Sequence, residues 1–184
     1  MAYLVAAVIF VGALCFLDLL LTFAIIRRLR LQAGPHAAGF AGPMPGIVPP
    51  ILPPGTEAPA FTAVTTTGVS RSLSDLAGQR SAIAFFAASC ESCRAQLADF
   101  ADYARSVPGG AAQVLAIVGG DARQASDIVA ALDGPASIVI EPEEGPVATA
   151  FSVWGYPTFY ALDERGRIVA GGMTVARLKP AQLV

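Results

Sequence analysis

The sequence predicts an α/β fold in which helices flank a mixed central sheet. Apolar runs of strand length alternate with amphipathic segments between residues 80 and 151, and such alternation is typical of a sheet with parallel strands. Two further apolar runs flank the segment Asp163–Arg167, which is a hairpin pattern because Gly166 can adopt positive φ. A helix pattern follows the apolar run at Arg80–Phe86 directly and includes Cys90 and Cys93. We therefore expect the sheet to position that cysteine pair.

The size and charge of the chain limit what it can be. A length of 184 residues allows one domain of ordinary size with extensions. The formal net charge of −2 gives no electrostatic reason to expect a nucleic-acid partner. The mean hydropathy of +0.59 is high for a soluble protein, and the N-terminal part of the chain accounts for the excess.

Residues 3–26 form a predicted transmembrane helix. Asp18 is the only charged residue in this run, which is long enough to cross the hydrocarbon core of a bilayer. The run is longer than the apolar part of a signal peptide and no basic residue precedes it, so we expect a single-pass anchor in membrane lipid. Arg27, Arg28 and Arg30 follow at once. By the positive-inside rule, these charges place the C-terminal domain in the cytoplasm.

The Arg cluster and a Pro/Gly-rich tether together make up residues 27–54. Seven prolines and five glycines fall within residues 33–55, a composition typical of a semi-extended linker. His36, the only histidine, lies in this tether. A catalytic Ser-His-Asp or Cys-His arrangement is therefore not expected in the folded domain, which we assign to residues 55–184.

The elements of the domain are predicted from residue periodicity and turn signals. It begins with two extended segments and a turn or short helix, at residues 61–64, 69–73 and 74–78. A buried strand over Arg80–Phe86 leads directly into a helix that Pro108 ends. The later elements are strands at 114–118, 137–140, 158–162 and 168–172, and helices at 121–132 and 146–151. Residues 175–184 remain for a closing helix, which Pro180 keeps short.

Cys90 is expected at the N-terminus of the helix that follows Arg80–Phe86, and Cys93 one turn inside it. Cys93, Leu97 and Phe100 recur at helical spacing. Unpaired backbone N–H groups and the helix dipole stabilise a thiolate at that end, so Cys90 is the predicted nucleophile. Three residues of helix bring the two sulfurs onto one side, within reach of a disulfide. Cys93 can then resolve a mixed disulfide formed at Cys90.

The same cysteine pair has two other interpretations, half of a zinc site or two small buried apolar residues. A structural zinc ion needs about four ligands, and the remaining candidates, Cys15 and His36, lie far upstream in other kinds of segment. The strand-to-helix context favours redox chemistry. We therefore predict neither a metal nor another cofactor.

A series of motifs across the domain resembles one family. The motifs are Gly55–Phe61, Gly68, Leu73–Gly78, Phe85–Cys93, Trp154–Phe159 and Asp163–Ile168. In this order and spacing they resemble the thioredoxin fold. More closely, they are similar to the membrane-anchored TlpA/ResA-like thiol-disulfide oxidoreductases, which include the MauD-type proteins.

The resemblance implies a protein disulfide or dithiol as substrate and a membrane or thioredoxin-type electron donor. It also implies that Pro157 is a cis-proline facing the cysteine pair, with Tyr156 supplying backbone groups to a passing substrate strand. Both assignments have a physical basis, since cis peptides are almost confined to X-Pro bonds and extended peptides bind by strand addition. Family analogy places the domain outside the cytoplasm, and we favour this extracytoplasmic side over the one that the arginines indicate.

Three positions depart from the family pattern. Ser89 stands where a Trp usually precedes the first cysteine, Ala84 replaces a buried acid on the central strand, and Gln96 replaces a Glu after the second cysteine. Proton transfer to and from Cys93 therefore lacks its usual helper. Glu141, at the end of a neighbouring strand, is a candidate proton relay; the alternative is an acid that faces solvent.

Three residues beside the cysteines are candidates for tuning the redox pair. Glu91 opposes formation of a thiolate by its negative charge, whereas Arg94 favours it. Ser92 lies between the two cysteines and completes the set. Because the two charges act in opposite directions, the set predicts no particular reduction potential.

Two other functions compete with disulfide exchange. An AhpC-type peroxiredoxin shares the fold and the Ala-Pro-x-Phe entry at Ala58–Phe61. Such proteins resemble one another in a Pro and a Thr upstream of the peroxidatic cysteine, where this chain has Ile83 and Ala87. A metal-handling or holding module is the non-enzymatic alternative, but copper proteins of this fold pair cysteines with a His in the folded domain. We therefore favour a membrane-tethered thiol-disulfide oxidoreductase acting through Cys90 and Cys93.

Overall fold

The computed structural model of the chain describes Tyr3, Gly12 and residues 51–179. The chain divides into two compact units, Met1–Ile47 and Val48–Val184, and the folded domain belongs to the second. Apart from Tyr3 and Gly12, the predicted transmembrane segment lies outside the described residues, as does the tether up to residue 50. None of the helices in the described part of the chain is long and apolar enough to cross a membrane.

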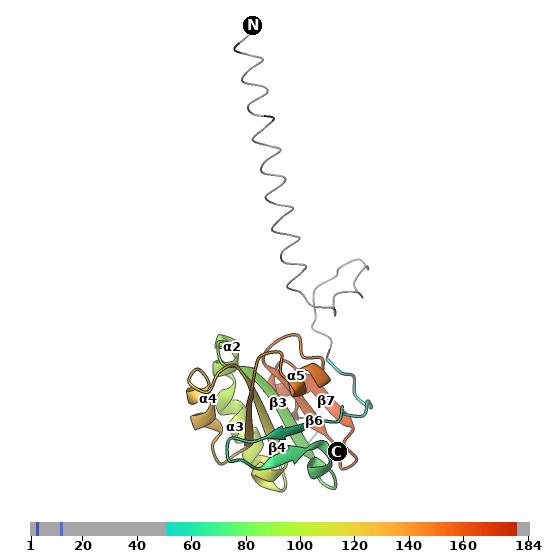
Figure 1. Cartoon of the computed structure of the whole chain (residues 1–184). Coiled ribbons are helices and arrows are strands. Elements are labelled where there is room, and N and C mark those ends of the chain that lie inside the picture. The colour runs from blue at the N-terminus through green and yellow to red at the C-terminus, as the bar shows by residue number, and fades with distance from the viewer. Residues whose placement is uncertain (1–2, 4–11, 13–50, 180–184) are drawn as a thin grey trace. The chain divides into compact units, whose positions relative to one another are not determined.

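A mixed five-stranded sheet in the order β5-β4-β3-β6-β7 forms the centre of the domain (Figure 1). Its strands are β3 (Ser81–Ala87), β4 (Val114–Gly119), β5 (Ser137–Glu141), β6 (Thr158–Leu162) and β7 (Ile168–Gly172). β3 pairs in parallel with β4 and antiparallel with β6, as expected when helical crossovers are followed by a hairpin. The predicted mixed sheet is confirmed, and β6 and β7 have the predicted bounds.

Four α-helices are found within residues 51–179. They are α2 (Glu91–Ala95), α3 (Leu97–Ser106), α4 (Ser126–Leu132) and α5 (Pro146–Ala150). The prediction of one continuous helix after β3 is wrong, because Gln96, with φ −106° and ψ 0°, separates α2 from α3. α4 does not begin at Asp121 as predicted. The Asp121 carboxylate accepts hydrogen bonds from the N–H groups of Arg123 and Gln124, and a side chain that binds nearby backbone favours a turn.

The two faces of β3 lead into two separate cores. All seven residues of β3 are buried, and successive side chains of a strand point to opposite faces. Phe86 packs edge-to-face on Phe100 of α3, in a core that α4 also contributes to. Phe85 packs on Phe151 and Tyr160, in a core that includes α5. Each such buried aromatic side chain stabilises the fold by about 1.5–3 kcal/mol, so the central strand is firmly held from both sides.

The N-terminal part of the domain packs on the second core. β1 (Thr62–Val64) and β2 (Ser70–Ser72) pair antiparallel, and a 3-10 helix, η2 (Leu73–Leu76), follows. Ile51 and Leu52 pack against the same core. The Leu52 N–H donates a hydrogen bond to the Tyr160 hydroxyl at 3.3 Å. The packed chain therefore extends to residues that the sequence assigned to the tether, before Gly55.

The C-terminal part of the described chain ends in a single 3-10 turn. Another short 3-10 helix, η3 (Gly110–Ala112), precedes β4, and the turn η4 (Val175–Arg177) follows β7. Val175 and Leu178 are buried in the first core, so η4 covers part of the surface for which a closing helix was predicted. Residues from Pro180 onward lie outside the described part.

Candidate active site

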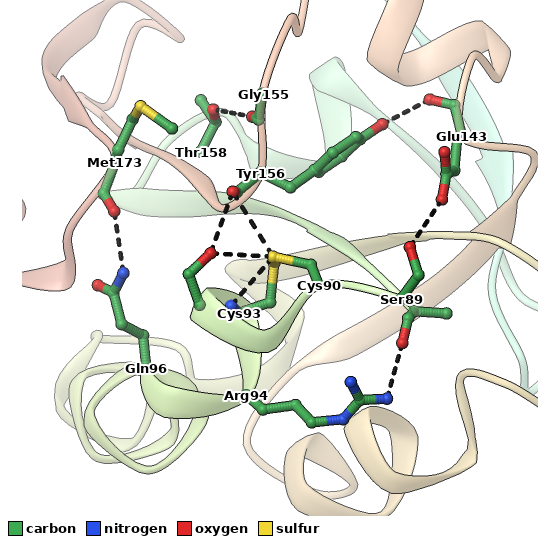
Figure 2. The surroundings of a disulfide bond; sticks show 12 residues. Ser89, Cys90, Cys93, Arg94, Gln96, Glu143, Gly155, Tyr156, Thr158 and Met173 are labelled. Carbon is green, nitrogen blue, oxygen red and sulfur yellow. Dashed lines mark hydrogen bonds between the residues drawn. A yellow bond between two sulfur atoms is a disulfide. The ribbon is translucent and has the colours of Figure 1, made fainter.

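The side chains of Cys90 and Cys93 are joined in a disulfide (Figure 2), and their Cα atoms are 5.2 Å apart. Cys90 is the N-cap of α2, and its Sγ accepts a hydrogen bond from the Cys93 N–H at 3.1 Å. Cys90 is partly exposed, whereas Cys93 is fully buried. The disulfide and its place at the start of the helix agree with the prediction. The difference in exposure suits one attacking and one resolving sulfur.

A turn after β3 carries Cys90 to the edge of the sheet. The Ala88 N–H donates to the Gly119 carbonyl at 2.8 Å, which extends the ladder between β3 and β4 by one residue. The Cys90 N–H then donates back to the Ala87 carbonyl at 3.1 Å. Cys90 itself has φ −93° and ψ 111°, the extended conformation that N-cap residues adopt. These local bonds place the predicted nucleophile at the carboxyl end of the central strand.

The loop that enters β6 lies opposite the disulfide. Its Tyr156–Pro157 peptide bond is cis, as predicted. The Tyr156 carbonyl oxygen is 3.6 Å from Cys90 Sγ and accepts a hydrogen bond from the Ser92 hydroxyl at 3.5 Å. The same hydroxyl is 3.2 Å from Cys90 Sγ. The structure therefore brings Cys90, Ser92 and Tyr156 together, while the binding of a substrate strand by this loop stays a prediction.

Arg94 binds Asp127 and Ala88 rather than either cysteine. Its Nε forms an ion pair with the Asp127 carboxylate at 2.6 Å, and its guanidinium also donates to the Ala88 carbonyl at 2.7 Å. The hydrogen bond from Arg94 lowers the pKa of Asp127 below its usual value. Glu91 is exposed to solvent. The tuning of Cys90 by Glu91 and Arg94 stays a prediction, and Arg94 would act through charge without a direct contact.

Glu141 lies inside the domain, so the alternative of a solvent-facing acid is wrong. Its side chain is only 7% exposed, and its carboxylate accepts hydrogen bonds from the N–H groups of Val147 at 3.1 Å and Ala148 at 2.8 Å. These donors are the unpaired N–H groups at the start of α5, which favour an anionic partner. A Cβ on Gly145 would come within 2.5 Å of Glu141 Cγ, so glycine there leaves room for the carboxylate. Its proton-relay role stays a prediction.

Gln96 joins the break between α2 and α3 to the C-terminal turn. Its Nε2 donates to the Met173 carbonyl at 3.0 Å, and its Oε1 accepts from the Val175 N–H at 3.0 Å. From the sequence this residue was only a departure from the family pattern. Its two partners lie 77 and 79 residues away, so no local signal could have indicated them.

Glu143, in the loop between β5 and α5, is a residue of the site that the sequence did not predict. Its carboxylate accepts a hydrogen bond from the Ser89 hydroxyl at 3.3 Å, and its backbone carbonyl accepts one from the Tyr156 hydroxyl (Figure 2). Burial raises the pKa of Tyr156 to about 12, helped by the negative charges of Glu143, Glu141 and Glu144. The phenol therefore stays protonated as a donor at neutral pH.

The arrangement is suited to thiol-disulfide chemistry. A disulfide with one reachable and one sheltered sulfur can exchange with an external thiol, because attack must come along the axis of an accessible S–S bond. Within residues 51–179, no group of three or more His, Cys, Asp or Glu side chains is placed to hold a metal ion.

The strand order, the disulfide after the central strand and the cis-proline opposite it together define a thioredoxin-like α/β fold. Residues 54–170 match the sequence pattern of the AhpC/TSA family. The chain therefore belongs to the AhpC/TSA family. A search of curated protein sequences finds no match.

Solved structures with the same fold include several redox proteins. The thioredoxin domain of a thiol-disulfide oxidoreductase from Bacteroides vulgatus is 19% identical with a TM-score of 0.60, over 72% of this chain and 96% of that one. An exposed lipoprotein thioredoxin from Streptococcus pneumoniae is 22% identical with a TM-score of 0.54, over 68% and 99%. A secreted disulfide oxidoreductase from Mycobacterium tuberculosis is 18% identical with a TM-score of 0.52, over 62% and 83%. At these identities the likeness establishes the fold.

Proposed function

We propose that this protein is a membrane-tethered thiol-disulfide oxidoreductase that reduces or exchanges protein disulfides through Cys90 and Cys93. The observation that carries the proposal is the position of Cys90, which is partly exposed and whose Sγ lies 3.6 Å from the Tyr156 carbonyl. Cys93, its disulfide partner, is fully buried. The names of the structural neighbours, which include oxidoreductases of this kind, support the same activity.

The reaction follows from the two sulfurs. In the reduced protein, the Cys90 thiolate attacks one sulfur of a substrate disulfide, and the other substrate sulfur leaves as a thiolate and takes up a proton. The Cys93 thiol then loses its proton and attacks Cys90 Sγ, which releases the second substrate sulfur as a thiol and leaves the Cys90–Cys93 disulfide. An external dithiol, from a membrane or thioredoxin-type donor, reduces this disulfide and is itself oxidised.

Tyr156 and Pro157 are the proposed substrate-binding residues. The Tyr156 carbonyl faces Cys90 directly, and a backbone carbonyl beside a reactive sulfur can accept a hydrogen bond from an extended substrate segment. Pro157 is buried and has no N–H, so the Tyr156 carbonyl is the only hydrogen-bonding group of the peptide bond between them. The site would therefore recognise the backbone of a substrate rather than one particular side chain.

The activity is tested with the full chain and an insulin disulfide as substrate. We expect the reduced protein to accelerate reduction of insulin by dithiothreitol, and the variant Cys90→Ser to have lost this activity. A wild-type rate no faster than that of dithiothreitol alone would contradict the proposal.

Peroxide reduction is the second candidate, because the chain belongs to the AhpC/TSA family. The residues upstream of Cys90 make peroxide reduction less favoured. This chain has Ile83 and Ala87 at the positions where peroxiredoxins resemble one another in having Pro and Thr. The groups within hydrogen-bond distance of Cys90 Sγ are the Cys93 N–H, the Ser92 hydroxyl and the Tyr156 carbonyl. Consumption of hydrogen peroxide by the reduced chain at a rate above that of insulin reduction would favour this second function.

The membrane anchor is proposed from residues 3–26, and the TlpA/ResA-like or MauD-like subtype from the motifs of the domain. We place the catalytic domain on the extracytoplasmic side, which the family resemblance supports, although Arg27, Arg28 and Arg30 favour the cytoplasm. A reporter fused after Val184 tests this placement. Activity of a reporter that works only in the cytoplasm would overturn it.

A further inference from the structure

We propose that Glu143 is a positioning residue that holds Ser89 and Tyr156 on either side of Cys90. The inference rests on the proposed function and adds a residue to its site. Glu143 accepts two hydrogen bonds, one at its carboxylate from Ser89 and one at its backbone carbonyl from Tyr156. It thereby connects the turn that precedes Cys90 to the loop that contains the cis-proline.

The carboxylate of Glu143 holds the turn between β3 and α2. The Ser89 hydroxyl donates to Glu143 Oε1 at 3.3 Å across 54 residues of sequence. Ser89 is exposed and immediately precedes Cys90. This hydrogen bond limits how far the turn before Cys90 can move away from the loop after β5.

The backbone carbonyl of Glu143 holds the ring of Tyr156. The Tyr156 hydroxyl donates to this carbonyl, and the ring packs against both cores of the domain. The same tyrosine presents its own carbonyl to Cys90 Sγ at 3.6 Å. Fixing the ring therefore helps fix the carbonyl that faces the sulfur.

Gly119 at the end of β4 lets Glu143 come close enough to make both contacts. A Cβ at residue 119 would lie 2.9 Å from Glu143 Cα and 3.4 Å from the Tyr156 hydroxyl. Contacts below about 3 Å are not tolerated by carbon atoms in a packed interior. The absence of a side chain at Gly119 is thus what allows the loop, the Cys90 turn and the Tyr156 ring to meet.

The functional consequence concerns the position of Cys90 Sγ relative to the Tyr156 carbonyl, which lies 3.6 Å from it. Both groups depend on Glu143, the sulfur through Ser89 and the carbonyl through the Tyr156 phenol. Loss of the carboxylate would let the Cys90 turn shift, and a reacting group displaced by a fraction of an ångström loses rate. Glu143 does not touch the reacting atoms, so its effect is on geometry.

The experiment compares four variants of the full chain in insulin reduction and in alkylation of reduced Cys90 by iodoacetamide as a function of pH. The variants are Glu143→Ala, Glu143→Gln, Ser89→Ala and Glu144→Ala, with the double variant Ser89→Ala/Glu143→Ala to measure coupling. Glu144 is the matched control, because it is also an exposed acid in the same loop and its carbonyl, not its side chain, accepts a hydrogen bond from Thr149.

We expect Glu143→Ala and Ser89→Ala each to lower kcat/KM by about two- to tenfold, the range of one lost hydrogen bond. The double variant should fall no further than either single variant, because both remove the same contact. Glu143→Gln should retain most of the activity, since its amide oxygen still accepts from Ser89. Glu144→Ala should behave as wild type.

Two results would overturn the proposal. Additive losses in the double variant would mean that Ser89 and Glu143 act independently. Equal losses for Glu143→Gln and Glu143→Ala, with the same shift in the pH profile of Cys90 alkylation, would mean that the charge of Glu143 acts instead of its position. If the wild-type chain does not reduce insulin, the proposed function fails. The alkylation rates of reduced Cys90 in the five variants still decide whether the hydrogen bond between Ser89 and Glu143 positions Cys90.

Discussion

The Tyr156 carbonyl oxygen lies 3.6 Å from the Cys90 Sγ, although the two residues are 66 positions apart in the chain. The sheet brings them together. Phe85 near the end of β3 pairs with Thr158 at the start of β6, and antiparallel pairing puts the end of one strand beside the start of the other. The segments that follow β3 and precede β6 must therefore meet at this edge.

The unequal exposure of the two sulfurs predicts different outcomes for the two cysteine variants. With Cys93→Ser, the mixed disulfide at Cys90 cannot be resolved, so a covalent complex with the protein substrate should accumulate while turnover is lost. Cys90→Ser should form no such complex, because Cys93 is fully buried. Non-reducing electrophoresis followed by mass spectrometry measures both. Equal trapping by the two variants would contradict the assigned roles.

The raised pKa of Tyr156 leads us to expect a loss of stability in alkaline solution. Its pKa is raised to about 12 in the folded chain from the usual 10.0, so between these values the folded state binds a proton that the unfolded state has released. The free energy of unfolding should therefore fall as pH rises through this window. Tyr156→Phe should be less stable than wild type at neutral pH, because it loses the bond to Glu143, and this difference should shrink above pH 10. Urea unfolding at several pH values measures it; a constant difference would contradict the expectation.

Glu141 is predicted to act on stability through α5. Glu141→Ala removes an acceptor from the N–H groups of Val147 and Ala148, so it should lower the free energy of unfolding by about 1–3 kcal/mol. Glu141→Gln retains one acceptor oxygen and should lose less. Urea unfolding gives the stabilities, and the pH profile of insulin reduction tests the proton relay. A shifted profile in a Glu141→Gln protein that remains folded would favour the relay; an unchanged profile would leave a purely structural role.

Gln96 should also contribute to stability, by holding η4 against the helical layer. Gln96→Ala leaves the Met173 carbonyl and the Val175 N–H without their side-chain partner, and we expect a loss of about 1–2 kcal/mol. Gln96→Glu keeps the acceptor for the Val175 N–H but loses the donor to the Met173 carbonyl. Its free energy of unfolding should therefore lie between those of Gln96→Ala and wild type. Thermal or urea unfolding checks the order. Wild-type stability in Gln96→Ala would contradict it.

Most of the scaffold follows from local patterns. β6 and β7 have the predicted bounds because apolar periodicity and a turn with Gly166 at positive φ are both encoded within a few residues. The helix after β3 was predicted too long as a single element, because Leu97 and Phe100 continue the apolar face of Cys93 across Gln96. Periodicity alone cannot detect the break, since it records which face is buried and not the backbone angles of one residue.

The sequence by itself determined the class of fold and the pairing of Cys90 with Cys93, because these depend on short-range periodicity and on the spacing within a motif. The cis-proline opposite the pair was implied by the family resemblance. The tertiary structure alone decided which groups Gln96, Glu141 and Glu143 contact. Their partners are set by which strand ends and loops lie side by side at the edge of the sheet, and that arrangement results from the packing of the whole domain.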